Sequence, residues 1–181
     1  MRTTDTSADG FSLIETIIAT GILAVGLLSL AAVFDLGLRT MAGSSPSLIA
    51  REKAREAVES VHTARDTGII PWAQIQNVAS GGVFVSGPQP LNLSGSDGLI
   101  NTADDGAVEA LTKPGPDNLL GTADDIVEPL NNFTREIQIT PLLTAGGAVE
   151  QNLRQIRVIV RYQVMNAWRT YTVTTYISAF S

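Results

Sequence analysis

The stretch GFSLIETIIATGILAVGLLSLAAV, residues 10–33, decides the fold of this 181-residue chain. From Thr16 to Phe34 the chain has 19 residues without a single charge. An uncharged apolar run of about 18 or more residues is typical of a membrane-spanning helix. One ionisable side chain, Glu15, stands at the front edge of this run. We therefore expect residues 11–34 to form a helix that lies in lipid.

The residues in front of the run have a recognisable order. A short polar leader, residues 1–10, ends in Gly10 and is followed directly by Phe-Ser-Leu-Ile-Glu. This order resembles the N-terminus of the type IV prepilin family, over about 25 residues. The resemblance implies that a membrane peptidase cuts between Gly10 and Phe11 and methylates the new amine of Phe11. It also implies that Glu15, then the fifth residue, receives the N-terminal amine of a neighbouring subunit in a filament.

A lone carboxylate in this position has a physical cost that a counter-ion would remove. An acidic side chain at the centre of a bilayer costs roughly 2.5 to 3.5 kcal/mol on insertion scales. The cost is lower near the interface, so Glu15 could instead lie among the lipid headgroups without a partner.

Two other interpretations of the apolar run stay open. A secretory signal peptide has a basic start and an apolar stretch of about 7 to 15 residues, whereas this leader carries Arg2 against Asp5 and Asp9 and the run is longer. Ala31-Ala32 could imitate a cleavage site. The other interpretation is an ordinary signal anchor. Neither requires the order of residues from Gly10 to Glu15.

The distribution of basic residues does not orient the span. Cytoplasmic flanks are usually enriched in Lys and Arg, but four basic residues follow the run: Arg39, Arg51, Lys53 and Arg55. A head outside the cytoplasm is therefore implied by the resemblance alone.

Composition limits what the rest of the chain does. Its length suits one small domain plus an anchor, and a net charge of −6 argues against nucleic acid as a partner. The chain has no Cys and one His, so thiolate zinc sites and multi-His metal sites are not expected. Apart from clustered acids it has no constellation of a nucleophile or an acid-base pair. We do not expect an enzyme.

Residues 35–68 have the pattern of an amphipathic continuation of the helix. Pro46 could begin a new helix with Ser45 as its N-cap, or it could lie within one long helix. Beyond Pro46, small apolar residues recur at spacings of three and four, which predicts one buried stripe. The stripe consists of Ala50, Ala54, Ala57, Val58, Val61 and Ala64, and charged residues from Arg51 to Glu59 occupy the other faces. Gly68 should end the helix.

Two segments of the predicted head, residues 69–181, repeat one sequence. Residues 95–106 read GSDGLINTADDG, and residues 115–126 read GPDNLLGTADDI. At a period of 20, Gly98 aligns with Asn118 and Asn101 aligns with Gly121. Gly and Asn tolerate positive φ. Both copies should therefore make the same tight turns.

The repeated segments lie in an acidic region, residues 95–128, with eight acidic residues and one base, Lys113. Like charges repel by roughly 1 kcal/mol at 4 Å even in water, and calcium relieves such repulsion by accepting six to eight oxygens. The spacing is not that of an EF-hand. The second copy resembles the calcium loop of major pseudopilins of type II secretion, whereas a solvated acidic loop is the alternative.

The resemblance and the repeat together name the calcium ligands. In the second copy the implied ligands are Asp117, Asp124 and Asp125, with Thr122 and the carbonyl of Leu119. In the first copy the repeat alone implies Asp97, Leu99, Asp104 and Asp105. One or two ions could bind.

The C-terminal part, residues 133–179, alternates as an antiparallel sheet does. We expect a strand from Phe133 to Ile139 that Pro141 ends, and a hairpin of Leu153–Val164 with Trp168–Ala179. A shorter strand is expected at Val83–Val85. The ending YTVTTYIS resembles minor pilins of the PilV kind and the related minor pseudopilins.

These inferences predict an α+β fold in which a long N-terminal helix packs on an antiparallel sheet of three or four strands. The resemblance implies a structural subunit, which we expect to be a minor one, of a type IV pilus or pseudopilus. Its partners would be the prepilin peptidase, other pilin or pseudopilin subunits and, before assembly, inner-membrane lipid. The alternative is a membrane-anchored calcium-binding module that does not polymerise. The sequence does not distinguish a pilus from a secretion pseudopilus or a DNA-uptake filament.

Overall fold

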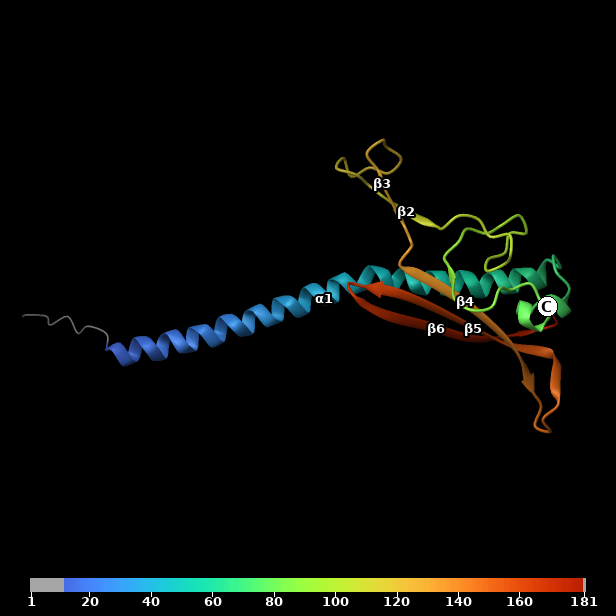
Figure 1. Ribbon diagram of the computed structural model, residues 1–181, viewed down its shortest axis with the longest axis horizontal. Coiled ribbons are helices and arrows are strands. Elements are labelled where there is room, and N and C mark those ends of the chain that lie inside the picture. The colour runs from blue at the N-terminus through green and yellow to red at the C-terminus, as the bar shows by residue number, and fades with distance from the viewer. Residues whose placement is uncertain (1–11, 181) are drawn as a thin grey trace, which may run out of the picture. The chain divides into compact units, whose positions relative to one another are not determined.

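A computed structural model describes residues 12–180, and its main element is one long helix, α1, Leu13–Asp66 (Figure 1). The chain divides into two compact units, Met1–Ala42 and Gly43–Ser181, and each is described by itself. The predicted leader and the predicted cleavage site at Gly10 and Phe11 lie outside the described residues.

The first unit holds the apolar part of α1. Every described residue from Ser12 to Met41 is exposed. The hydroxyls of Thr16, Thr20 and Ser29 donate to carbonyls three or four residues back, so they need no water as a partner. Among residues 12–180, α1 is the helix that is long and apolar enough to cross a membrane. It is a candidate for a single membrane span.

Pro46 lies inside α1. A proline in a helix interior removes one backbone hydrogen bond but does not always end the helix. Here helical hydrogen bonding continues on both sides of Pro46. The alternative in which Ser45 caps a second helix is therefore wrong.

Within the second unit, α1 buries the predicted stripe of small residues. Ala50, Ala54, Ala57, Val61 and Ala64 are fully buried, and Val58 packs at the edge of the same core. Such small side chains allow the facing sheet to come close to the helix. Gly68 follows the end of the helix with φ +64°, as predicted.

The facing sheet is antiparallel and has four strands in the order β1-β4-β5-β6. Their bounds are β1 Gln89–Pro90, β4 Phe133–Leu143, β5 Val149–Val164 and β6 Ala167–Ser178. The face toward α1 is apolar and carries, among others, Ile137, Ile139, Ile156, Val158, Val160 and Ile177. The α+β class and the sheet of three or four strands are confirmed.

Pro141 does not end its strand, contrary to the prediction. β4 continues to Leu143, and Pro141 pairs with Arg154 of β5. On its other side β4 is covered by β1 only at Thr134 and Arg135. Pro141 therefore lies at a free edge, where its missing N–H removes no ladder hydrogen bond.

The predicted hairpin of the last two strands is confirmed. β5 and β6 are joined by Met165 and Asn166, and Met165 has φ +55°. β5 begins at Val149, four residues before the predicted start at Leu153.

The segment between α1 and the sheet forms two short 3-10 helices, η1 Trp72–Gln74 and η2 Val78–Ser80. The strand predicted at Val83–Val85 is absent from the described structure, and Phe84 instead makes a single bridge to Asn77. The Asn77 amide donates to the carbonyl of Ile137 and accepts from the N–H of Ile139. One side chain thus forms hydrogen bonds with two backbone groups at the edge of β4 that no strand covers.

A separate two-stranded sheet was not predicted. β2 Ala110–Lys113 pairs antiparallel with β3 Ile126–Pro129. This hairpin carries the second acidic segment and projects away from the helix and the larger sheet (Figure 1).

Candidate functional site

The two acidic segments fold as copies of one loop. We call residues 95–106 loop 1 and residues 115–126 loop 2. In loop 1, Asp97 Oδ1 accepts from the N–H of Leu99 at 2.8 Å, and the Asp97 N–H donates to Asp104 at 3.2 Å. In loop 2, Asp117 makes the same two bonds, to Leu119 and to Asp124, at the same two distances.

The backbone turns also agree. φ is +70° at Gly98 and +60° at Asn101 in loop 1, and +57° at Asn118 and +88° at Gly121 in loop 2. The exchange of Gly and Asn between the copies therefore marks shared left-handed turns, as predicted.

A glycine and a threonine hold the first paired acid in each loop. A Cβ at Gly95 would overlap Asp104, and one at Gly115 would overlap Asp124, so only glycine fits. The Thr102 hydroxyl donates to Asp104 at 2.8 Å, and the Thr122 hydroxyl donates to Asp124 at 2.6 Å.

These hydrogen bonds favour the ionised acids. Donation from the hydroxyls of Ser96 and Thr102 lowers the pKa of Asp104 to about 2. Donation from Thr122, followed by the Asp117 N–H, lowers the pKa of Asp124 as well. Both carboxylates are therefore negative at neutral pH.

The loops differ in what surrounds their tips. Leu99 and Ile100 of loop 1 are 0% and 3% exposed, whereas the equivalent Leu119 and Leu120 of loop 2 are 61% and 65% exposed. The same turns thus present a buried apolar pair in one loop and a solvent-exposed pair in the other.

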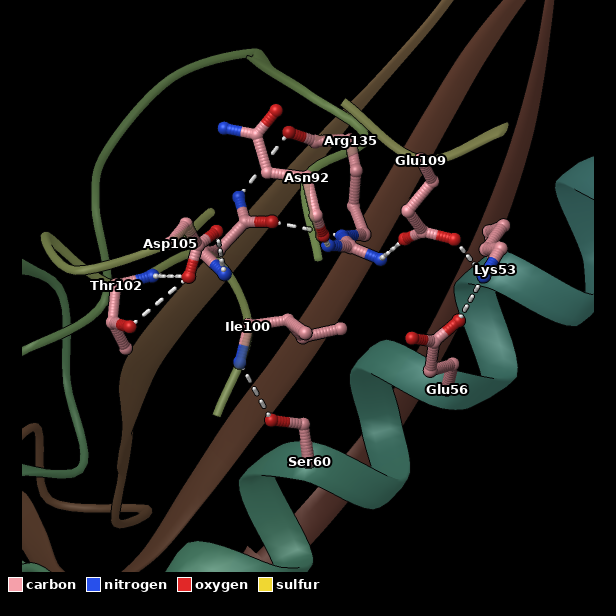
Figure 2. A network of polar contacts seen from close by, with 10 residues as sticks. Lys53, Glu56, Ser60, Asn92, Ile100, Thr102, Asp105, Glu109 and Arg135 are labelled. Carbon is pink, nitrogen blue, oxygen red and sulfur yellow. Dashed lines mark hydrogen bonds and ion pairs between the residues drawn. The ribbon is translucent and has the colours of Figure 1, made fainter. Parts of the chain in front are cut away.

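Loop 1 is held on the helix and the sheet by hydrogen bonds (Figure 2). The Ile100 N–H donates to the Ser60 hydroxyl of α1 at 3.1 Å. Arg135 of β4 donates to the Asn101 side chain at 2.8 Å, and that side chain donates back to the Arg135 carbonyl at 3.3 Å.

Arg135 begins a buried chain of charges that ends on α1 (Figure 2). Its side chain is fully buried, and Nη1 lies 4.0 Å from Oε1 of Glu109, just before β2. The other Glu109 oxygen forms an ion pair with Lys53, which also contacts Glu56 at 2.7 Å. Burial alone would lower the pKa of Lys53, but these two carboxylates outweigh it and raise the pKa above 10.5.

The sequence interpretation missed this chain of charges. Lys53 lies outside the alanine stripe, as predicted, but its pairing with Glu109, 56 residues later, was not predicted. Arg135 did carry a readable signal: it occupies the same face of its strand as Phe133 and Ile137, where the alternation calls for an apolar residue. A charge on an apolar face requires a partner.

The ligands predicted for calcium are brought close within each loop. No group of three or more His, Cys, Asp or Glu side chains converges on a metal-sized site in residues 12–180. In loop 1, Asp105 Oδ1 accepts from the backbone and hydroxyl of Thr102. In loop 2, Asp125 Oδ1 is buried and has no hydrogen-bond donor in the described structure. Loop 2 therefore has a buried carboxylate oxygen without a donor at the position where loop 1 has a hydrogen-bonded one.

Glu15 lies in the first turn of α1 and is exposed. A carboxylate is favourable there because the N-terminus of a helix carries a partial positive charge. Its predicted partner, the Phe11 amine, belongs to residues that are not described.

Comparisons with known proteins give no match to a family model, to a curated protein or to a solved structure.

Proposed function

We propose that this chain is a subunit, a minor one, of a type IV pilus or pseudopilus. One observation supports this most: a single helix carries an exposed, uncharged apolar half with one acid at its start, and a second half buried under a four-stranded antiparallel sheet. An exposed apolar helix requires lipid or other helices around it. A filament core of such helices would supply the second environment.

The steps follow from the N-terminal residues. The chain is first anchored in the inner membrane with its head outside the cytoplasm, and prepilin peptidase cleaves after Gly10. The Phe11 amine of one subunit then pairs with Glu15 of its neighbour. A buried charge left without its partner costs about 3–5 kcal/mol. Subunits out of register are therefore disfavoured.

Calcium is the second part of the proposal. Asp117, Asp124, Asp125, Thr122 and the Leu119 carbonyl would hold the ion in loop 2, where it would offset three neighbouring negative charges. For loop 1 the same proposal, through Asp97, Leu99, Asp104 and Asp105, is supported by the shared backbone geometry alone.

The assembly role is tested by replacing each of two acidic residues on the same helix with alanine in separate variants. Glu15→Ala should reduce incorporation into sheared or pelleted fibres at least tenfold, because the neighbour's amine loses its partner. Asp35→Ala is the matched control, since Asp35 is an exposed acid on α1 that forms an ion pair with Arg39, and it should enter fibres normally.

Two outcomes would contradict the proposal. Equal incorporation of Glu15→Ala and the parent would remove the role of Glu15. Full-length protein that stays in the membrane with its leader attached and still binds calcium would favour the non-polymerising calcium module instead.

A further inference from the structure

Loop 2 presents an apolar pair in a conformation that the same chain elsewhere uses for burial. Leu119 and Leu120 occupy the positions of Leu99 and Ile100, with the same turns on both sides. In loop 1 those positions are buried, but in loop 2 they project from the end of the β2–β3 hairpin. Two adjacent exposed leucines held by a structured turn are suited to insertion into another surface.

Charge restricts what that surface can be. Loop 2 carries Asp117, Asp124 and Asp125 and no basic residue, and the nearest base, Lys113, is paired with Glu128. One bound calcium ion would still leave the three carboxylates of loop 2 with a net charge of −1. An acidic rim around two leucines favours a receptor that combines apolar side chains with a positive charge.

The outer face of the sheet has a depression that combines a cation with apolar side chains. Arg161 lies opposite Thr134 and Thr170 across the ladder, on the face away from the buried Val160 and Tyr162. An open depression of about 500 Å³ on this face is lined by Pro88, Thr134, Arg161, Trp168 and Thr170. Trp168 is 59% exposed.

Arg161 supplies the charge that the acidic loop requires. It forms no salt bridge with any residue in 12–180, so it is free to pair with an acid from outside. The depression combines this free cation with an exposed indole. Trp and Arg are the residues that most often anchor protein interfaces.

We propose that loop 2 of one subunit docks into the Arg161–Trp168 depression of a second copy of this chain. The inference rests on the proposed function, since it names a contact between heads within the filament. In a filament each subunit would give this contact to one neighbour and receive it from another, so the contact would be heterologous and would continue along the filament.

Crosslinking in the full-length chain tests this contact directly, because the chain contains no cysteine of its own. Ala123→Cys in loop 2 and Thr170→Cys in the depression leave Leu119, Leu120, Arg161 and Trp168 intact. A short bismaleimide added to producing cells should give a ladder of covalent multimers. The matched control pairs Thr170→Cys with Ala103→Cys, the equivalent exposed position of loop 1, and should give no ladder.

Two substitutions identify the source of any ladder. Leu120→Ser and Arg161→Glu change exposed residues and should each lower its yield at least tenfold. A ladder that is unchanged by both, or equal in the Ala103 control, would overturn the proposal.

The N-terminus of the assembled protein separates this inference from the proposed function. Fibres that begin at Phe11 but give no ladder would refute the docking contact and leave the assembly role standing. Protein that keeps its leader and forms no fibres would refute both.

Discussion

At the scale of single residues, the two copies of the acidic repeat have the same backbone turns, but one copy is packed against the core and the other is exposed. Asn101 and Gly121 share a left-handed conformation, but only Asn101 has a side chain that reaches Arg135. Asparagine at that position therefore does two things: it tolerates the turn, and its side-chain oxygen accepts a hydrogen bond from a fully buried guanidinium.

This difference predicts that replacing each residue by its counterpart in the other loop lowers the free energy of unfolding by unequal amounts. Asn101→Gly keeps the turn but removes the bond to Arg135, and it should lower the free energy of unfolding by about 1.5–3 kcal/mol. Gly121→Asn meets no atom near its Cβ, but φ at this position is +88°, so it should cost less, about 1 kcal/mol. Urea unfolding of the detergent-solubilised chain, followed by tryptophan fluorescence, measures both. Equal effects would contradict the role given to the Asn101 side chain.

The lowered pKa values predict how the loops respond to acid. A carboxyl whose folded pKa lies below its unfolded value stabilises the fold above the unfolded value, 3.8, and loses this effect as pH falls toward the folded one. Loop 1 should therefore loosen between about pH 4 and 2. NMR titration of the Asp104 carboxyl carbon should give a midpoint near 2, and Ser96→Ala should raise it. A midpoint that Ser96→Ala does not move would argue against the hydroxyl as the cause.

At the scale of elements, sequence patterns predicted the features that depend only on residues close together in the chain. The alanine stripe of α1, the end of the helix at Gly68 and the β5–β6 hairpin follow from periodicity and turn residues. The continuation of β4 through Pro141 depends on β1 leaving that edge free. The pairing of β2 with β3 depends on the conformation of the loop between them. The ion pair of Lys53 depends on the position of Glu109. Local sequence patterns do not predict these contacts, because the contacts join residues that are far apart in the sequence.

The buried charges between α1 and the loops should matter far more than similar charges at the surface. Lys53→Met leaves the buried Glu109 with the more distant Arg135, at 4.0 Å, as its remaining cation and should cost about 3 kcal/mol. Lys113→Met breaks an ion pair whose partners are both 55% exposed, and it should cost less than about 1 kcal/mol. Thermal unfolding of the two variants under identical conditions provides the comparison. Similar losses would contradict the account of this network.

The raised pKa of Lys53 predicts that the stabilisation by that network is lost at high pH. A base whose folded pKa exceeds its unfolded value of 10.5 stabilises the fold below 10.5 and loses the effect above the folded value. In the parent chain stability should therefore fall as pH rises beyond 10.5, and Lys53→Met should remove that part of the fall.

Calcium should act on loop 2 before loop 1. We expect calcium to raise the melting temperature of the parent chain, and Asp124→Asn to abolish most of that shift. Asp104→Asn, the matched change in loop 1, should remove less of it, because Asp105 Oδ1 of loop 1 already accepts hydrogen bonds from Thr102, whereas Asp125 Oδ1 of loop 2 has no donor in the described structure. Magnesium, which demands strict octahedral geometry, should have a smaller effect. No calcium shift in the parent chain would refute the metal proposal without affecting the assembly role.

At the scale of the whole molecule, the chain combines an apolar helix that needs neighbours with a head that is already well packed. The helix half from Ser12 to Met41 has no described contact that buries it, while the second unit has a continuous core. The sequence alone predicted this contrast, because an uncharged run and an alanine stripe are both visible in one helix. The surfaces of the head that would contact other subunits became visible only when the exposure of Leu119, Leu120 and Trp168 was known.

The central claim is that the leader is removed and the new N-terminus is used in assembly. The most direct test is the intact mass and N-terminal sequence of the protein recovered from fibres. The account predicts a chain that begins at Phe11 and carries one methyl group on its amine. Fibres built from chains that still contain residues 1–10 would contradict it.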